Sequence, residues 1–210
     1  MIIEVDEYKK KIPGYDPEKS ELVHSESAKL ANKDFDTALK SQKYKRIIFM
    51  AGGTASGKTE FAFSYLNKKD QLVYDGTLKT FDGFQVKLKN IQRYTKNNPK
   101  IKVVLILPEN TTKSFAAFLK RDRKMENITF FNTHILSKIS ISKILINSNV
   151  RVEVYISRVL SGSNKLDFIR LPIGKIGRKK LANNLISIAK RLYTTADNLG
   201  LDLEINFDMM

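Results

Sequence analysis

The chain has 210 residues, of which 42% are hydrophobic and 28% charged, so it is long enough and apolar enough to bury a core unaided. It has no cysteine, which excludes disulfides, thiolate metal sites and cysteine nucleophiles. No apolar run has the length of a membrane span, and the acidic N-terminus does not resemble a signal peptide. We therefore expect a cytoplasmic protein with no membrane partner.

The first 45 residues predict a strand, a bend and a long helix. A short apolar run at residues 2–5 predicts a strand, and Asp6 follows it directly. Pro13-Gly14 breaks the chain, and Pro17 is typical of the first turn of a helix. Apolar residues at helical spacing extend this predicted helix to about Leu39.

Residues 46–51 predict a second strand, and the segment after it carries the strongest motif of the chain. Residues 52–59 are Gly-Gly-Thr-Ala-Ser-Gly-Lys-Thr and match the P-loop pattern G-x-x-x-x-G-K-[ST]. The glycines let successive amides turn toward phosphate oxygens, and the N-terminus of the next helix adds positive potential. Lys58 supplies a mobile charge for the β- and γ-phosphates, and Thr59 a hydroxyl ligand for Mg²⁺. The motif predicts that ATP and Mg²⁺ bind at Gly52, Gly53, Thr54, Ala55, Ser56, Gly57, Lys58 and Thr59.

Strands and helices continue to alternate after the P-loop. Strands are predicted at residues 72–75, 101–107, 150–159 and 166–171, with a possible last strand at 203–207. Helices are predicted around residues 61–66, from 84 to about 97, and at 111–124, 133–146 and 181–199, with connections at 161–164 and 172–177. This order predicts an α/β fold, a three-layer sandwich of the P-loop NTPase type with a mostly parallel sheet. We expect one domain over residues 1–210, with a substrate-side segment (1–44), a nucleotide-binding core (45–160) and a C-terminal appendage (161–210).

Two aspartates follow predicted strands and are candidates for chemistry at the phosphates. Parallel α/β sheets bind ligands outside the carboxyl ends of their strands, where Asp6 and Asp75 fall. Glu109 also follows a strand, but it lies behind Pro108 and ranks lower. Either aspartate could instead form a turn or cap a helix.

Several short segments resemble zeta-toxin-type P-loop kinases over about residues 2–160, although the P-loop is the one highly specific motif among them. They are Asp6-Glu-Tyr-Lys9 with Ile12-Pro-Gly-Tyr15, His24-Ser-Glu-Ser-Ala28, Tyr74-Asp-Gly-Thr-Leu78, the helix from Lys113 to Arg123 with its basic end, and Asn132-Thr-His134. In the best-known zeta toxins the aspartate segment and the substrate helix follow the P-loop. Here they precede it, which amounts to a circular permutation.

The resemblance implies a kinase that transfers the γ-phosphate of ATP to a hydroxyl of a small molecule, a UDP-amino sugar in this family, within a toxin–antitoxin system. It implies that Asp6 is the catalytic base, with Lys58, Arg121 and Arg123 as further catalytic residues. It also implies substrate contacts by Lys9, His24, Ser27, Asp75 and Thr77, and a metal contact by Thr59. Whether an antitoxin protein binds this chain stays open.

The arginines depart from the family pattern. The family brings two to the phosphates, one at a helix end and one from a lid. Arg121 or Arg123 fits the first position, whereas the lid position at residues 126–132 contains none. Either Arg123 covers both roles, or catalysis is slow, or the chain is a degenerate relative. Both arginines also suit a solvated helix end.

The charge leaves a second functional hypothesis open. The net charge of +15 attracts polyanions, but the lysines are spread along the chain, which favours a solvated surface over a nucleic-acid groove. The alternative is an ATP-binding module or ATPase without kinase activity that associates with nucleic acid. His24 and His134 are the only histidines and lack metal-ligand spacing, so we expect no metal other than Mg²⁺.

Overall fold

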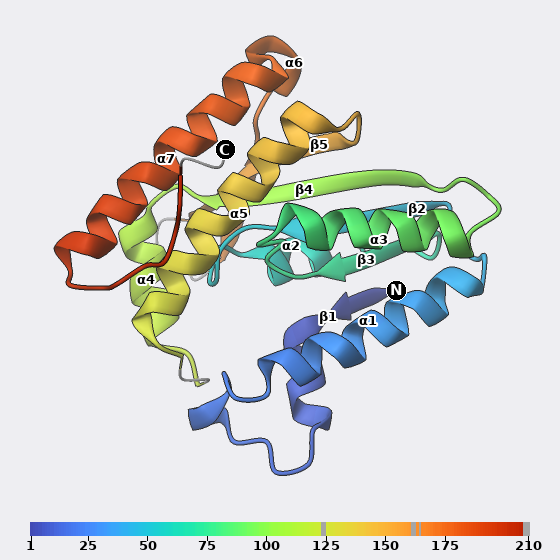
Figure 1. Ribbon diagram of the computed structural model, residues 1–210, viewed down its shortest axis with the longest axis horizontal. Coiled ribbons are helices and arrows are strands. Elements are labelled where there is room, and N and C mark those ends of the chain that lie inside the picture. Colours follow the sequence, from blue (N-terminus) through green and yellow to red (C-terminus); the bar gives the residue numbers. More distant parts are fainter. Residues whose placement is uncertain (123–124, 161–162, 164, 208–210) are drawn as a thin grey trace.

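The computed structural model describes residues 1–122, 125–160, 163 and 165–207 and confirms the predicted α/β sandwich (Figure 1). Its sheet has the strand order β1-β3-β2-β4-β5-β6, with parallel pairing from β1 to β5 and an antiparallel β6. The strands are β1 (Ile2–Glu4), β2 (Arg46–Ala51), β3 (Gln71–Asp75), β4 (Lys100–Pro108), β5 (Arg151–Val159) and β6 (Leu166–Arg170).

Helices cover both faces of this sheet. They are α1 (His24–Lys40), α2 (Lys58–Tyr65), α3 (Phe81–Tyr94), α4 (Thr111–Leu119), α5 (Asn127–Asn147), α6 (Ile173–Ile176) and α7 (Arg178–Asn198), with 3₁₀ helices η1 (Val5–Lys11) and η2 (Pro17–Lys19). Side chains alternate along a strand, so Phe49 and Val103 pack toward α1, α3 and α5. Ile48 and Val104 pack on the other face against α2.

A second core joins α4, α5, α7 and the C-terminal tail. Phe118 and Phe130 are buried in it, and Figure 1 shows α7 alongside α5. The strand expected at residues 203–207 is wrong, because the tail there is irregular and packs on these helices instead. Leu203 is buried, and the Phe207 ring meets Tyr193 edge-on at 5.5 Å. The alternating pattern of this segment therefore reflects contact with helices, not pairing in a sheet.

Several helix boundaries differ from those predicted. Only η2 forms at Pro17, where the Asp16 carboxylate accepts a bond from the Glu18 amide at 2.9 Å. Leu22 is 79% exposed and so adds nothing to a buried stripe, and α1 begins at His24. Helix α4 ends at Leu119, earlier than expected.

The connections around the last two long helices also differ from those predicted. Helix α5 begins at Asn127, so it includes most of the segment expected to be a lid. The connection at residues 172–177 contains α6, and α7 begins at Arg178. The Arg178 guanidinium donates to the carbonyl oxygens of Ile144, Leu145, Ser148 and Val150 at 2.6 to 3.2 Å. It thereby binds carbonyls in the last turn of α5 and in the segment after it, and ties that end of α5 to α7.

The sheet topology brings the ends of three strands together. Glu4 pairs with Asp75 in the β1–β3 register, and Phe49 pairs with Tyr74 in the β2–β3 register. Parallel strands share the direction of their carboxyl ends, so Asp6, the P-loop and Asp75 all lie at one edge. Within the ranges described, no helix combines the length and apolar character needed to cross a membrane.

Candidate functional site

A cavity of about 940 Å³ opens at this edge of the sheet. The P-loop and the end of β3 form one side, while η1, the start of α1 and the α4–α5 connection form the other. The cavity thus lies between the segments that precede the P-loop and the core that follows it.

Most of the residues predicted for the site line this cavity. They are Asp6, His24, Thr54, Ala55, Ser56, Gly57, Lys58, Thr59, Asp75, Thr77 and Arg121. Gly52, Gly53, Lys9 and Ser27 do not line it. Arg123 lies outside the described residues.

The glycines of the P-loop are placed where a side chain has no room. A Cβ on Gly52, whose φ is +132°, would lie 2.4 Å from the Ile106 carbonyl oxygen. A Cβ on Gly53 would lie 2.1 Å from the ring of His134. Gly57 has a φ of 87° and forms the N-cap of α2. The loop conformation therefore depends on glycine at these positions.

Side chains from α4, α5, β5 and the P-loop itself donate hydrogen bonds to the carbonyl oxygens of the P-loop. Lys58 Nζ donates a hydrogen bond to the carbonyl oxygen of Gly53 at 2.7 Å, and His134 Nε2 donates one to the carbonyl oxygen of Thr54 at 2.9 Å. The next two carbonyl oxygens accept from serine hydroxyls: that of Ala55 from Ser114 Oγ at 2.8 Å, and that of Ser56 from Ser157 Oγ at 2.7 Å. In a trans peptide the next N–H points opposite to the C=O. The amides of residues 55–57 are therefore turned to the opposite side of the loop, where these residues line the cavity. Such a row of inward amides is suited to binding an anion.

Helix α5 adds a second set of contacts to the loop. Thr133 Oγ1 accepts from the Thr54 amide at 3.0 Å and lies 2.8 Å from the Thr54 hydroxyl. His134 is fully buried. Burial is the main cause that holds its pKa well below the usual range, and the charge of Lys138 is the next, so the ring is neutral. Sequence reasoning missed the supporting roles of Ser114, Ser157 and Thr133, and only the Asn132-Thr-His134 segment had drawn notice, through the family resemblance.

Lys58, Thr59 and Asp75 form a charged group at the floor of the cavity. Thr59 Oγ1 donates to Asp75 Oδ2 at 2.8 Å. Burial raises the pKa of the Asp75 carboxyl, which Lys58 and the Thr59 hydrogen bond oppose. Burial also lowers the pKa of Lys58, which the Asp75 charge opposes. The Lys58 ammonium and the Asp75 carboxyl are thus both buried, and each acts on the pKa of the other with little solvent to screen the charges.

The Thr59 and Asp75 oxygens suit a hard cation that also binds phosphate oxygens. Mg²⁺ binds through one or two protein oxygens plus phosphate oxygens and waters, and Thr59 and Asp75 supply that oxygen pair. Among the described residues no cluster of three or more His, Asp or Glu side chains forms a cage for a metal. The donor set therefore suits an ion that binds together with a nucleotide.

Asp6, in η1, lines the same cavity as the P-loop. Its side chain is 35% exposed, and its charge acts on both Lys58 and Asp75. Arg121 also lies near enough to lower the pKa of Lys58, although less than burial does. His24 lines the same cavity. Its pKa is lowered mainly by burial and next by the charge of Lys9.

Two predicted substrate residues, Lys9 and Ser27, are buried and make contacts within the chain. The Lys9 side chain is fully buried, and its Nζ lies 3.3 Å from Asp6 Oδ1. Ser27 is buried as well, and its hydroxyl donates to the His24 carbonyl at 2.9 Å in the first turn of α1. Both residues therefore lie behind the cavity wall, next to predicted site residues.

Three further polar groups of the cavity were not among the predicted site residues. Asn32 Oδ1 accepts from the Tyr74 hydroxyl at 2.7 Å and from Lys87 Nζ at 2.6 Å. Burial lowers the pKa of Lys87 to about 8, and its ammonium lies 4.3 Å from the centre of the Tyr74 ring. Each is a polar residue on a helix face or strand, and nothing in the local pattern separates it from a surface residue.

Glu21 joins the N-terminal segment to α5 across the cavity. Its Oε1 accepts from the Glu126 amide at 3.1 Å and from the Thr129 hydroxyl at 2.5 Å. A carboxylate at the start of a helix satisfies an orphan amide and suits the helix dipole. The segment expected to be a lid is thus attached to the wall opposite the P-loop.

The chain matches no protein-family model, and no match to a curated protein was found. Inward amides and a lysine at a helix N-terminus bind phosphates, an oxygen pair suits Mg²⁺, and a partly exposed carboxylate can accept a proton.

Proposed function

We propose that the protein is an ATP-dependent phosphotransferase that phosphorylates a hydroxyl of a small molecule. The observation that carries the proposal is that a P-loop with inward amides and the Asp6 carboxylate line the same cavity. A nucleotide-binding module without transfer activity needs the first feature but has no need of the second.

In the proposed reaction, the acceptor oxygen attacks the γ-phosphorus of ATP and forms a new P–O bond. The bond between this phosphorus and the bridging oxygen breaks, and ADP leaves with the electron pair. Asp6 accepts the proton of the acceptor hydroxyl. Atoms and charge balance without a further reactant.

The chain's own groups bind and orient the two substrates. The amides of residues 55–57 and Lys58 would hold the phosphates, and Arg121 would offset charge on the transferred group. Mg²⁺, held by Thr59 and Asp75, would supply charge neutralisation at the phosphate oxygens.

The acceptor would bind between η1 and α1, where Asp6 and His24 line the wall. A cavity of about 940 Å³ is at the large end of small-molecule sites, enough for a nucleotide and an acceptor together. By resemblance to zeta toxins, a UDP-amino sugar is the first acceptor to test.

The experiment is a screen of hydroxyl compounds, nucleotide sugars first, incubated with the protein, ATP and Mg²⁺. We expect one class of compound to gain the mass of a phosphoryl group, with matching ADP release. ATP binding without transfer to any compound would contradict the proposal. Salt-steep binding of DNA or RNA together with acceptor-independent ATP turnover would instead favour the nucleic-acid ATPase.

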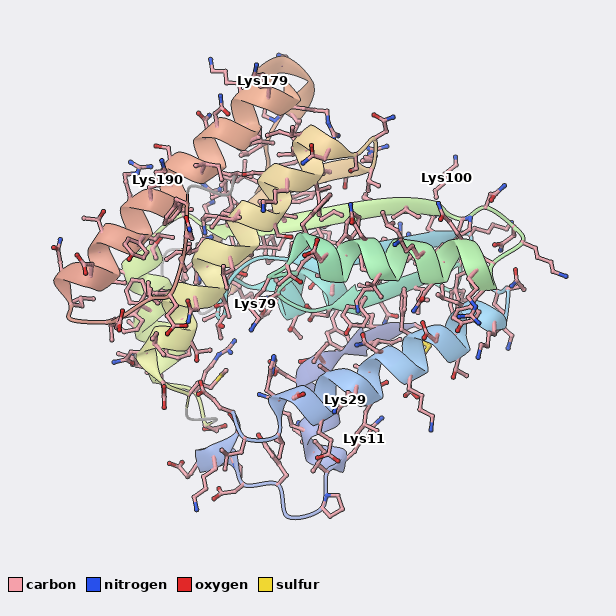
Figure 2. The ribbon with its side chains drawn as sticks, in the orientation of Figure 1. Lys11, Lys29, Lys79, Lys100, Lys179 and Lys190 are labelled. Atoms are coloured by element: carbon pink, nitrogen blue, oxygen red, sulfur yellow. The ribbon has the colours of Figure 1, made fainter. Side chains whose placement is uncertain are left out.

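The distribution of lysine argues against that second function. Figure 2 labels six lysines that are not gathered on one element: Lys11 and Lys29 lie in η1 and α1, Lys79 follows β3, Lys100 begins β4, and Lys179 and Lys190 lie along α7. A nucleic-acid groove would gather such residues along one face. The net charge of +15 is thus better explained as a solvated surface.

A further inference from the structure

Lys9 and Asp6 are paired by the geometry of η1. Residues three apart in a 3₁₀ helix lie directly above one another, because this helix has three residues per turn. Asp6 and Lys9 have that spacing in Val5–Lys11, and Lys9 Nζ lies 3.3 Å from Asp6 Oδ1. The pair is asymmetric, because Lys9 is 0% exposed while Asp6 is 35% exposed and faces the cavity.

The Lys9 ammonium has little else to stabilise it. It makes no hydrogen bond within the described residues, and Asp6 is its only acidic partner within 4 Å there. Burying an ammonium costs several kcal/mol unless an opposite charge compensates for it. A sequence under no functional constraint could place Met or Leu at this position at lower cost.

We propose that Lys9 is a positioning residue that keeps Asp6 ionised and turned toward the cavity. This inference rests on the proposed function, in which Asp6 is the base. Lys9 would act from behind the base, through an ion pair that no substrate reaches, and it would not contact substrate as its sequence suggested.

The need for such a residue follows from the charges around Asp6. Several charged or titratable groups act on Asp6, among them Lys9 in η1, His24 in α1, Lys58 in α2 and Asp75 in β3. ATP would bring further negative charge and would engage Lys58. Of these four groups, Lys9 is the cation that does not line the cavity, so it would stay paired with Asp6 while the phosphates occupy the site.

The test compares Lys9→Met with the wild-type protein by a carbon-13 NMR titration of the Asp6 carboxyl, assigned with Asp6→Asn. Met has nearly the same shape without the charge. We expect the titration midpoint of Asp6 to move up by about one pH unit or more in Lys9→Met. The control is Lys11→Met, which removes a charge from the same helix where Lys11 lies over the Tyr8 ring at 4.0 Å. An unmoved midpoint in Lys9→Met would overturn the inference.

A second readout is the pH dependence of acceptor phosphorylation. In Lys9→Met the acidic limb of the rate profile should shift to higher pH by a similar amount, with near wild-type rates on the alkaline side. ATP affinity should stay unchanged, which verifies that the P-loop is intact. A rate lowered equally at all pH values would show a merely structural role and contradict the inference.

The two failures are distinguishable. If the wild-type protein phosphorylates no acceptor, the proposed function fails, whereas the NMR titration still decides whether Lys9 sets the charge state of Asp6. If the wild type is active and the Asp6 titration is insensitive to Lys9, only the inference fails.

Discussion

The two walls of the cavity are built in different ways. The wall proposed to bind phosphates, here called the phosphate-binding wall, is a backbone structure in which four consecutive carbonyls accept side-chain hydrogen bonds. The wall proposed to bind the acceptor, here called the acceptor wall, consists of side chains on η1 and α1, where Asp6 pairs with Lys9 and both act on the pKa of His24. A backbone cradle requires glycine at set positions, whereas a charged wall requires only that a few side chains be brought close.

This difference has a consequence for how each wall tolerates change. The cradle is over-determined by contacts from α4, α5 and β5, so its shape should survive loss of any one of them. The acceptor wall depends on few contacts, so single changes there should alter chemistry more than stability.

Loss of the P-loop lysine, Lys58, should strongly weaken ATP binding at the phosphate-binding wall. We expect Lys58→Met to weaken ATP binding by about 100-fold or more, because it removes charge-assisted bonds to phosphate. Calorimetry with ATP and Mg²⁺ measures this. Lys68→Met, at an exposed position just after α2, is the matched control and should bind as the wild type does. Equal affinity in both variants would contradict the P-loop assignment.

Asp75→Asn should uncouple nucleotide binding from magnesium. Because Asp75 accepts the Thr59 hydroxyl and would share the metal, we expect the increase in turnover on adding Mg²⁺ to shrink by about 10- to 100-fold. ATP affinity measured without Mg²⁺ should be equal or higher, since a nearby negative charge is gone. Asp82→Asn, in the first turn of α3, serves as the control. An unchanged magnesium response would rule out this carboxylate as a ligand.

Gly53→Ala tests the backbone cradle itself. The added Cβ would lie 2.1 Å from the His134 ring, so we expect the free energy of unfolding to fall by about 2 kcal/mol. Urea denaturation measures this, and the cost should be smaller in a His134→Ala background. Gly174→Ala is the control, since nothing lies within 4 Å of a Cβ there. An equal loss of unfolding free energy from Gly53→Ala in the wild-type and His134→Ala proteins would show that His134 does not confine the loop.

Lys138→Met gives a pH-dependent effect on the helix behind the cradle. Burial lowers the pKa of Lys138 to about 7 from 10.5, so between these values the unfolded chain binds more protons and wild-type stability rises with pH. We expect Lys138→Met to increase the free energy of unfolding by about 1 kcal/mol or more below pH 7, and by progressively less as the pH approaches 10. Lys143→Met, on the same helix, should show no such trend. A pH-independent gain would show that Lys138 is buried without its charge being suppressed.

Much of the phosphate-binding wall could be predicted from the sequence, because it is encoded by neighbouring residues. The strand before Gly52 and the Gly57-Lys58-Thr59 run specify the loop, and Asp75 follows from the rule that parallel strands end at the ligand side. What could not be predicted is the support of the loop. Ser114 is 59 residues from its partner and Ser157 is 101 residues away, and no local pattern reports such contacts.

The acceptor wall was harder to predict, because charge patterns do not report burial. The family resemblance implied that Lys9 contacts substrate, and nothing in the local sequence shows that η1 buries its side chain. The tail at residues 203–207 shows the same limit for structure. Its alternating pattern is typical of a strand, but the available partners were helices α5 and α7.

The most direct test of the proposal that the two walls serve one reaction is to measure ATP affinity and acceptor phosphorylation on Asp6→Asn in the same preparation. We predict ATP affinity within about threefold of the wild type and phosphoryl transfer lowered by about 100-fold or more, because only the proton acceptor is lost. Transfer at the wild-type rate by Asp6→Asn, with ATP affinity intact, would contradict the role of Asp6 and with it the link between the two walls.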